Sequence, residues 1–155
     1  MKKTILMVLI GLAFCMNALA QQGRSDLQIA DSLYTLKQWK SAREYYQHYL
    51  KDTSTNAIAW NRMGYSNQNL GLYEEALKDY QKSLTNKPSP PLKSAIFSRT
   101  ARIYSLMNKT NEAAGWLVKI GATGYNIQPD LDTMADFKNV RQAANYADIK
   151  KKVYE

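Results

Sequence analysis

AIAWNRMGYSNQNLGLYEEALKDYQKSLTNKP, residues 57–88, carries two apolar stripes at helical spacing that are separated by Gly71. Gly71 suits the left-handed position that follows a helix end, and Pro88 cannot continue the helix before it. Gly64 on one stripe and Ala76 on the other are small enough for two helix backbones to approach closely. The stretch therefore predicts two antiparallel helices joined by a tight turn.

The same pattern recurs on both sides of this stretch. Ala76 corresponds to Ala42 at a spacing of 34 residues and to Ala113 at a spacing of 37. Asn108 takes the place of Gly71, and Asn is the other residue that tolerates a left-handed turn position. The three extra residues of the longer spacing fall in a proline-rich loop, which can lengthen without disturbing either helix. Three consecutive units in register are expected.

The middle unit resembles a tetratricopeptide repeat, whose 34-residue pattern is W-x2-L-G-x2-Y followed by A-x3-F, A and P. The matching positions are Trp60, Met63, Gly64, Ala76, Tyr80, Ser83 and Pro88. Asn67 departs from the pattern, because the family usually has Tyr there. The resemblance implies an all-α fold, with three tetratricopeptide-like helix pairs in residues 21–125 that form a short right-handed superhelical solenoid. A C-terminal capping helix is expected within residues 126–155.

The capping segment is expected from a second spacing beyond residue 125. Apolar residues recur at every third position, which predicts short helical turns lying on the last repeat: Leu131, Met134, Phe137 and Val140. Tyr146, Ile149 and Val153 then mark one side of a final helix, whose other side carries residues Lys150 to Lys152. The loop at Tyr125-Asn126 and the run ending at Arg141 loosely resemble the closing segment of bacterial repeat arrays.

Helix starts can also be placed from residue types. Ser25 with Gln28 three residues later is typical of a capping box. The first helix of the third unit is expected to start near Leu92 to Ile96, after the prolines. Thr110 is expected to cap the following helix with its hydroxyl group, and acidic Glu112 follows in the first turn, where negative charge is favourable.

Residues 1–20 are interpreted as a cleaved signal peptide. A short basic start precedes an apolar run that is too short to span a bilayer, and Ala18-Leu19-Ala20 supplies the small residues before a cleavage site. Phe14 precedes Cys15 where a lipoprotein signal has a small residue, so lipidation of Cys15 is not expected. The mature chain would start at Gln21, be periplasmic or secreted, and hold no transmembrane helix.

The composition restricts the class of partner. The chain has 21 basic and 13 acidic residues, a formal net charge of +8, which falls to +6 without Lys2 and Lys3. No basic run is longer than residues Lys150 to Lys152, so nucleic-acid binding is not expected, while weak contact with anionic surfaces stays open. The mature chain has no cysteine and therefore needs no disulfide.

The residue types needed for catalysis are nearly absent. His48 is the only histidine, and its repeat position is normally solvent-exposed. Glu74-Glu75 stands in the first turn of a helix, where negative charge is favourable, and the acidic pair Asp130 and Asp132 has no base or nucleophile beside it. We therefore expect no catalytic residues, no cofactor and no metal, and interpret the protein as a non-enzyme.

Because the sequence offers no catalytic residues, we expect the protein to act through a binding surface. The resemblance implies that the first helix of each unit lines a concave groove that holds a peptide or protein partner. The expected groove residues are Tyr34, Asn61, Tyr65, Gln68, Asn69, Ser98, Arg102 and Ser105. Asn61, Tyr65 and Arg102 are expected to dominate binding, since they combine an amide, an aromatic hydroxyl and a guanidinium.

The sequence thus predicts a protein-interaction or assembly module of the bacterial periplasm or cell envelope. The best-known peptide-binding members of the family hold the terminal carboxylate of a peptide with Lys and Asn side chains at fixed groove positions. Leu27 and Asp31 stand where the first Lys and the first Asn would fall, so this binding mode is not expected. Two alternatives stay open. The chain could be an accessory subunit of an envelope enzyme, or a basic peripheral module attached to anionic envelope surfaces. Neither the partner nor the oligomeric state follows from the sequence.

Overall fold

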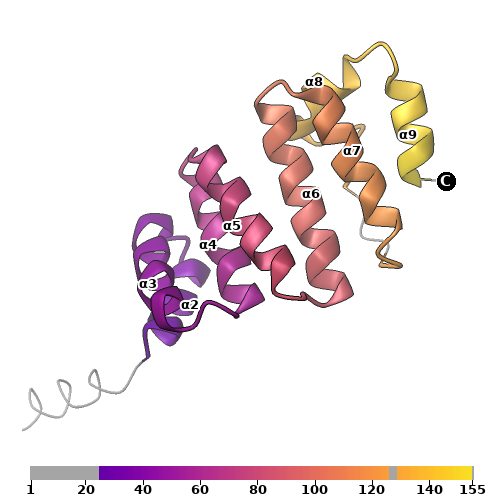
Figure 1. Ribbon diagram of the computed structural model, residues 1–155. Coiled ribbons are helices and arrows are strands. Elements are labelled where there is room, and N and C mark those ends of the chain that lie inside the picture. The colour runs from indigo at the N-terminus through magenta and orange to yellow at the C-terminus, as the bar shows by residue number, and fades with distance from the viewer. Residues whose placement is uncertain (1–24, 126–128, 155) are drawn as a thin grey trace, which may run out of the picture.

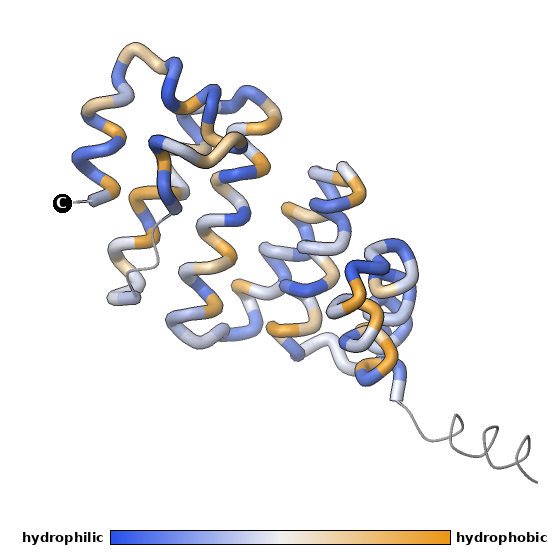
Figure 2. Tube along the Cα trace, turned by 180° about the vertical axis from the view of Figure 1, so that it is seen from behind, coloured by the Kyte–Doolittle hydropathy of each residue, from blue (hydrophilic) through white to orange (hydrophobic). Residues whose placement is uncertain are grey.

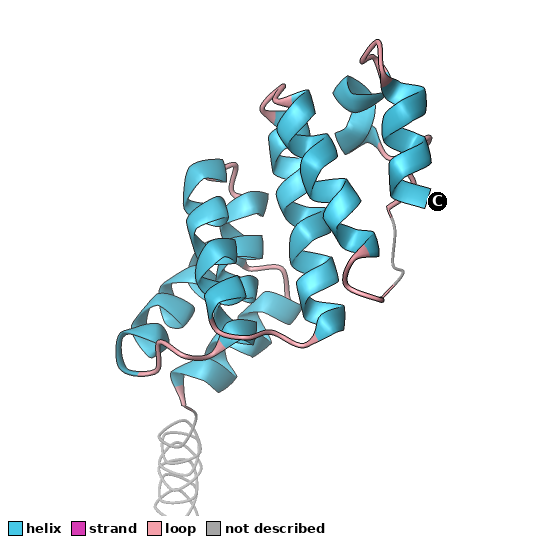
Figure 3. Ribbon diagram, turned by 45° about the vertical axis from the view of Figure 1, so that its right-hand side comes forward, coloured by secondary structure: helices cyan, strands magenta, loops and turns pink. Residues whose placement is uncertain are grey.

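The computed structural model describes residues 25–125 and 129–154, and every regular element in those ranges is helical (Figures 1 and 3). The elements are α2 (Asp26–Thr35), α3 (Trp39–Asp52), α4 (Ala57–Asn69), α5 (Tyr73–Thr85), α6 (Pro90–Leu106), α7 (Thr110–Gly121), η1 (Ala135–Phe137), α8 (Lys138–Arg141) and α9 (Tyr146–Tyr154).

Three helix pairs, α2/α3, α4/α5 and α6/α7, stack one after another along the molecule (Figure 1). Each helix packs most closely on its partner within the pair, and α3 then packs on α4 and α5 on α6. The described chain starts at one end of the stack and ends at the other. This arrangement confirms the all-α solenoid predicted from the repeat spacing.

The close crossing predicted at Gly64 is confirmed. A Cβ atom added to Gly64 would lie 2.8 Å from two ring carbons of Tyr80 and 3.1 Å from the Cβ of Asp79. The Tyr80 ring is itself only 1% exposed, so it has little room to move. Only glycine therefore allows α4 and α5 to approach this closely.

The turns inside the three pairs use corresponding positions with a left-handed backbone. Gly71 has a φ of 75°, and Asn108 has a φ of 59°, which confirms both expectations from the sequence. Lys37 fills the corresponding position of the first pair with a φ of 58°. The turn is thus set by backbone geometry even where the residue carries a Cβ atom.

Of the three helix starts predicted from residue types, the structure confirms one and differs from the other two. The capping box at Ser25 is present, since its hydroxyl accepts from the Gln28 N–H and the Gln28 side chain accepts from the Ser25 N–H. The prediction that α6 begins near residue 92 was wrong: it begins at Pro90, because proline is tolerated in a first turn. The hydroxyl cap at Thr110 was also wrong, since the N-cap residue is Lys109 and makes no side-chain cap bond.

The closing segment covers the third pair as predicted. Its buried side chains join those of α7 in one apolar cluster, and Figure 2 shows apolar positions spaced along the helices among hydrophilic ones. The cluster includes Leu117, Ile120, Leu131, Phe137, Val140, Ile149 and Val153. Since a stacked array exposes apolar surface at its last repeat, this segment buries what the third pair leaves uncovered.

Within the described residues, every helix is too short or too polar to cross a bilayer. The expected signal peptide in residues 1–20 and Asn126 of the expected closing loop both lie outside the described ranges.

Candidate functional site

Arg62 of α4 links the first helices of the first two pairs. Its guanidinium donates to Asp31 of α2 at 2.5 Å and lies over the Tyr34 ring, 5.6 Å from the ring centroid. Asp31 also accepts from the Tyr46 hydroxyl at 2.6 Å, and the Arg62 side chain stays about a third exposed at 35%. A partly exposed cation is thus held in place by a carboxylate and an aromatic ring.

Arg99 of α6 repeats this arrangement one pair further along. Its guanidinium donates to Asn61 of α4 at 2.6 Å and lies over the Tyr65 ring, 4.4 Å from the ring centroid. Arg62 and Arg99 are 37 residues apart and therefore occupy corresponding positions of the second and third units. Each arginine reaches back to the first helix of the preceding pair, where it finds an oxygen acceptor and a ring.

The aromatic rings beneath these arginines also contact one another. The Tyr34 and Tyr65 centroids are 5.8 Å apart, and Trp39 lies edge-on to both at 5.5 and 5.6 Å. Burial raises the pKa of Tyr34, although the charge of Arg99 opposes the shift. We refer to the surface formed by the following six residues as the first-helix band: Asp31, Tyr34, Asn61, Arg62, Tyr65 and Arg99.

The chain's own closing segment covers the end of α6. Arg102 donates its Nε to Asp136 of η1 at 2.6 Å, and Asn139 of α8 donates to the Ser105 carbonyl at 2.9 Å. Both side chains of the Arg102–Asp136 ion pair are less than a third exposed. The third unit therefore presents less open surface on its first helix than the first two units do.

The expected groove residues accordingly divide into accessible and buried ones. Tyr34, Tyr65, Ser98 and Arg102 are half-buried, and Asn69 is exposed and donates to the Tyr65 carbonyl at 2.7 Å. These positions retain surface that a partner can contact. Whether they bind a partner stays a prediction.

Three of the expected groove residues need correction, because they are not accessible. Asn61 is only 5% exposed and acts as the acceptor for Arg99, so it positions that guanidinium from below. Gln68 is 9% exposed because its Oε1 accepts from the buried Tyr80 hydroxyl at 2.7 Å. Ser105 is fully buried beneath the closing segment.

Sequence reasoning missed Arg62 and Arg99. Each follows directly after a residue assigned to the groove, Asn61 or Ser98, so a fixed set of groove positions does not include either arginine. Their recurrence at corresponding positions of two units was a usable signal. The position of Arg102 was predicted, but its pairing with Asp136 joins segments 34 residues apart and has no local signature in the sequence.

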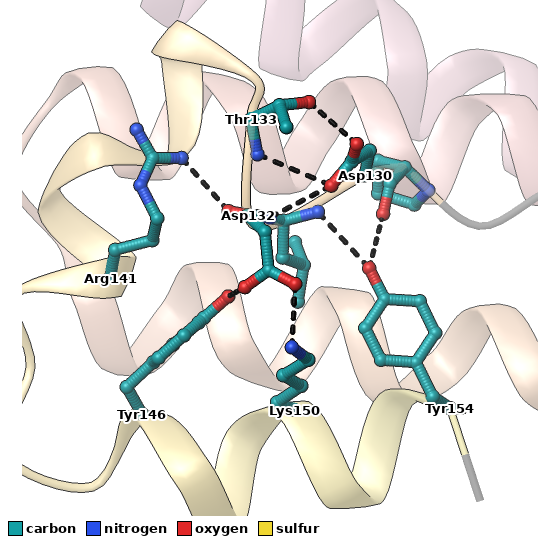
Figure 4. Close-up of polar contacts among 9 residues, drawn as sticks. Asp130, Asp132, Thr133, Arg141, Tyr146, Lys150 and Tyr154 are labelled. Atoms are coloured by element: carbon teal, nitrogen blue, oxygen red, sulfur yellow. Dashed lines mark hydrogen bonds and ion pairs between the residues drawn. The ribbon is translucent and has the colours of Figure 1, made fainter.

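The acidic pair Asp130 and Asp132 has a structural role (Figure 4). Asp130 accepts from the backbone N–H groups of Asp132 and Thr133 at 2.9 and 3.2 Å. Asp132 accepts from the Tyr146 hydroxyl at 2.7 Å and from the Lys150 ammonium at 2.5 Å. These partners lower the pKa of Asp132, with the Lys150 contact contributing most. Asp130 therefore orders the loop before η1, and Asp132 fastens α9 to that loop.

Other chemical groups give no sign of a reaction centre in the described ranges. His48 is exposed, as expected, and pairs with Asp26 across α2 and α3. No group of three or more His, Cys, Asp or Glu side chains within residues 25–125 and 129–154 is arranged to hold a metal ion. The arrangement that stands out is the first-helix band.

Comparison with known proteins agrees with the architecture. Residues 57–90, which comprise α4, α5 and the start of α6, match the tetratricopeptide repeat family. This repeat generally mediates protein–protein interaction and is typically non-enzymatic. No curated protein matches the chain.

Proposed function

We propose that this protein is a non-enzymatic interaction module that binds an extended, carboxylate-bearing segment of a partner protein along the first-helix band. The stack of Arg99 on Tyr65 is the observation that carries this proposal. It holds a half-buried guanidinium at a fixed place on the first-helix face, where Arg62 presents a second cation.

The arginines have donor capacity beyond their contacts within the chain. A guanidinium has five N–H donors in a planar fork, which matches the two oxygens of a carboxylate. The amide oxygen of Asn61 occupies only part of the Arg99 fork. A partner's Asp or Glu side chain can therefore add to the existing contacts instead of breaking them.

The tyrosines add area and hydrogen-bonding capacity. Tyr34 and Tyr65 present aromatic surface that is already ordered by Trp39, so little side-chain freedom is lost when a partner binds. Tyrosine and arginine are also enriched among the residues that dominate binding energy at protein interfaces. The net charge of +6 that remains without Lys2 and Lys3 favours an acidic partner at longer range.

We further propose that the module works in the periplasm or cell envelope, as the N-terminal sequence suggests. The first alternative, an accessory subunit of an envelope enzyme, would use the same band. The second, attachment to anionic surfaces through the lysines of α9, is less well supported because Lys150 is engaged by Asp132. Raising the salt concentration distinguishes attachment to anionic surfaces from protein binding along the first-helix band, because charge-driven attachment weakens strongly with ionic strength.

Site-specific photocrosslinking tests the proposed binding face. A photoreactive residue at Tyr65 should crosslink a partner in the native cells, whereas one at exposed Lys82 of α5 should not. An excess of a soluble Asp- and Glu-rich peptide should suppress the product formed at Tyr65. Crosslinking to the same partner only from Lys82 would place the binding face on the second helices.

A further inference from the structure

Two clefts lie between successive second helices, on surfaces separate from the first-helix band. One, of about 410 Å³, lies between α3 and α5 above α4, and the other, of about 490 Å³, lies between α5 and α7 above α6. Because the units repeat, corresponding positions line both clefts but carry different chemistry. The corresponding residues are Arg43 and Leu77, Asn67 and Tyr104, and Asp79 and Trp116.

The cleft between α3 and α5, which we call the polar cleft, has a buried polar floor. Asn67 donates its amide to Asp79 Oδ2 at 2.7 Å, and the two residues are only 4% and 7% exposed. The remaining amide oxygen of Asn67, Oδ1, is buried without a hydrogen-bond partner, and so is Nε of Arg43 on the α3 side. Buried polar atoms are nearly always paired in folded proteins, so an acceptor and a donor are both left for a ligand.

The lining of the polar cleft also combines both signs of charge with an apolar wall. Asp79 and Glu75 supply carboxylates, and Arg43 and Lys78 supply cations. The wall consists of Trp60 and Met63. A ligand that satisfies this lining needs a cation with N–H donors, an anion and a short apolar group.

We propose that the polar cleft binds a free α-amino acid with an apolar side chain. The ligand ammonium would donate to Asn67 Oδ1 and Asp79, and the ligand carboxylate would accept from Arg43. Its side chain would lie against Trp60 and Met63. The cleft is at the small end of the usual range for ligand pockets, which suits a ligand of this size.

The ionisation of Asp79 is consistent with such a ligand. Burial raises its pKa to about 7, although the amide of Asn67 and the charges of Arg43 and Lys78 oppose the shift and that of Glu75 adds to it. A buried ammonium beside the carboxyl would favour its ionised form. Binding near neutral pH should therefore release protons, which calorimetry detects as a binding enthalpy that changes with the ionisation enthalpy of the buffer.

The sequence shows how the polar floor of this cleft arises. The tetratricopeptide pattern usually has Tyr at the position of Asn67, and Tyr104 fills the corresponding position in the third unit. A short amide in place of the ring provides the acceptor at the floor of the polar cleft. Asn67→Tyr is therefore a substitution that the fold accommodates elsewhere and that should remove this acceptor.

Calorimetric titration with apolar amino acids tests the proposal on the whole protein. Leucine, isoleucine, valine, methionine and phenylalanine serve as probes at millimolar concentration. At least one should bind, and its N-acetyl derivative and its amide, which lack the ammonium and the carboxylate respectively, should each bind at least about tenfold more weakly. Failure of all five to bind would overturn the proposal, as would undiminished binding of the N-acetyl derivative or of the amide.

Single-residue variants test whether the amino acid binds in the polar cleft. Asn67→Tyr and Asp79→Asn should each lower the affinity at least about tenfold, while Gln81→Ala, in the other cleft, should leave it unchanged. Melting curves and circular dichroism establish that each variant is folded, and Asp79→Asn keeps the shape of the floor in case Asn67→Tyr does not fold. Binding that survives in both folded variants would contradict the assignment.

Discussion

Arg102 of α6 forms an ion pair with Asp136 of η1, and this contact joins the last repeat to the closing segment. Both side chains are largely shielded, at 28% and 26% exposed, so the pair is screened less by salt than a fully exposed one. The guanidinium of Arg102, which the sequence suggested for partner binding, is therefore already bound to a carboxylate of the same chain. This contact explains why the first-helix band is expected to act through Arg99.

Removing this contact should loosen the closing segment locally. Asp136→Ala should increase amide hydrogen exchange in residues 129–141 and lower the free energy of unfolding by about 1 kcal/mol, in the range of partly exposed ion pairs. Asp148→Ala is the matched control, since it removes an exposed carboxylate from the same part of the chain. Equal exchange in the two variants would mean that the pair does not hold the segment.

The crossing of α4 and α5 gives a second prediction. Gly64→Ala should lower the free energy of unfolding by about 1–3 kcal/mol, because the added Cβ would lie 2.8 Å from the Tyr80 ring. Gly115→Ala in α7 is the control: a Cβ there meets nothing within 4 Å, and alanine favours helix by about 0.5–1 kcal/mol. Denaturant unfolding should thus shift the two variants in opposite directions, and a shift in the same direction would be inconsistent with this crossing.

Asp79 predicts how stability depends on pH. Its pKa is raised from 3.8 to about 7 by burial, so its ionisation is more costly in the folded chain than in the unfolded one. The contribution of Asp79 to the free energy of unfolding is therefore most favourable below pH 3.8 and is lost as the pH rises through about 7. A pKa shift of this size corresponds to a change of at most about 4 kcal/mol in the free energy of unfolding.

Comparison with Asp79→Asn isolates this contribution. The difference in unfolding free energy between the wild type and this variant should change between pH 4 and pH 8, with the wild type losing stability relative to the variant as the pH rises. Urea unfolding at several pH values measures it. A difference that stays constant over this range would show that Asp79 titrates normally.

The fold could be read from the sequence because its determinants are local and periodic. Gly64, Gly71 and Asn108 have backbone or packing roles that follow from residue type and spacing. The two wrong helix starts, at Pro90 and Thr110, show that residue preferences do not place helix ends to within one residue.

The candidate site was harder to predict because its contacts join different helices. Spacing places Tyr65 on the first-helix face, but it does not show that Arg99 crosses from the next pair to cover the ring. The burial of Ser105 likewise depends on a segment more than thirty residues away. The recurring arginine position is the local sign by which the sequence could have indicated Arg62 and Arg99.

The affinity of the Tyr65→Ala/Arg99→Ala variant for the partner captured at Tyr65 tests most directly whether the first-helix band binds that partner. The double variant should stay helical and lose at least about 2 kcal/mol of binding free energy, which is roughly a thirtyfold loss of affinity. The control Gln81→Ala/Lys82→Ala, exposed on α5, should bind as the wild type does. Wild-type affinity in the folded Tyr65→Ala/Arg99→Ala variant would contradict the account.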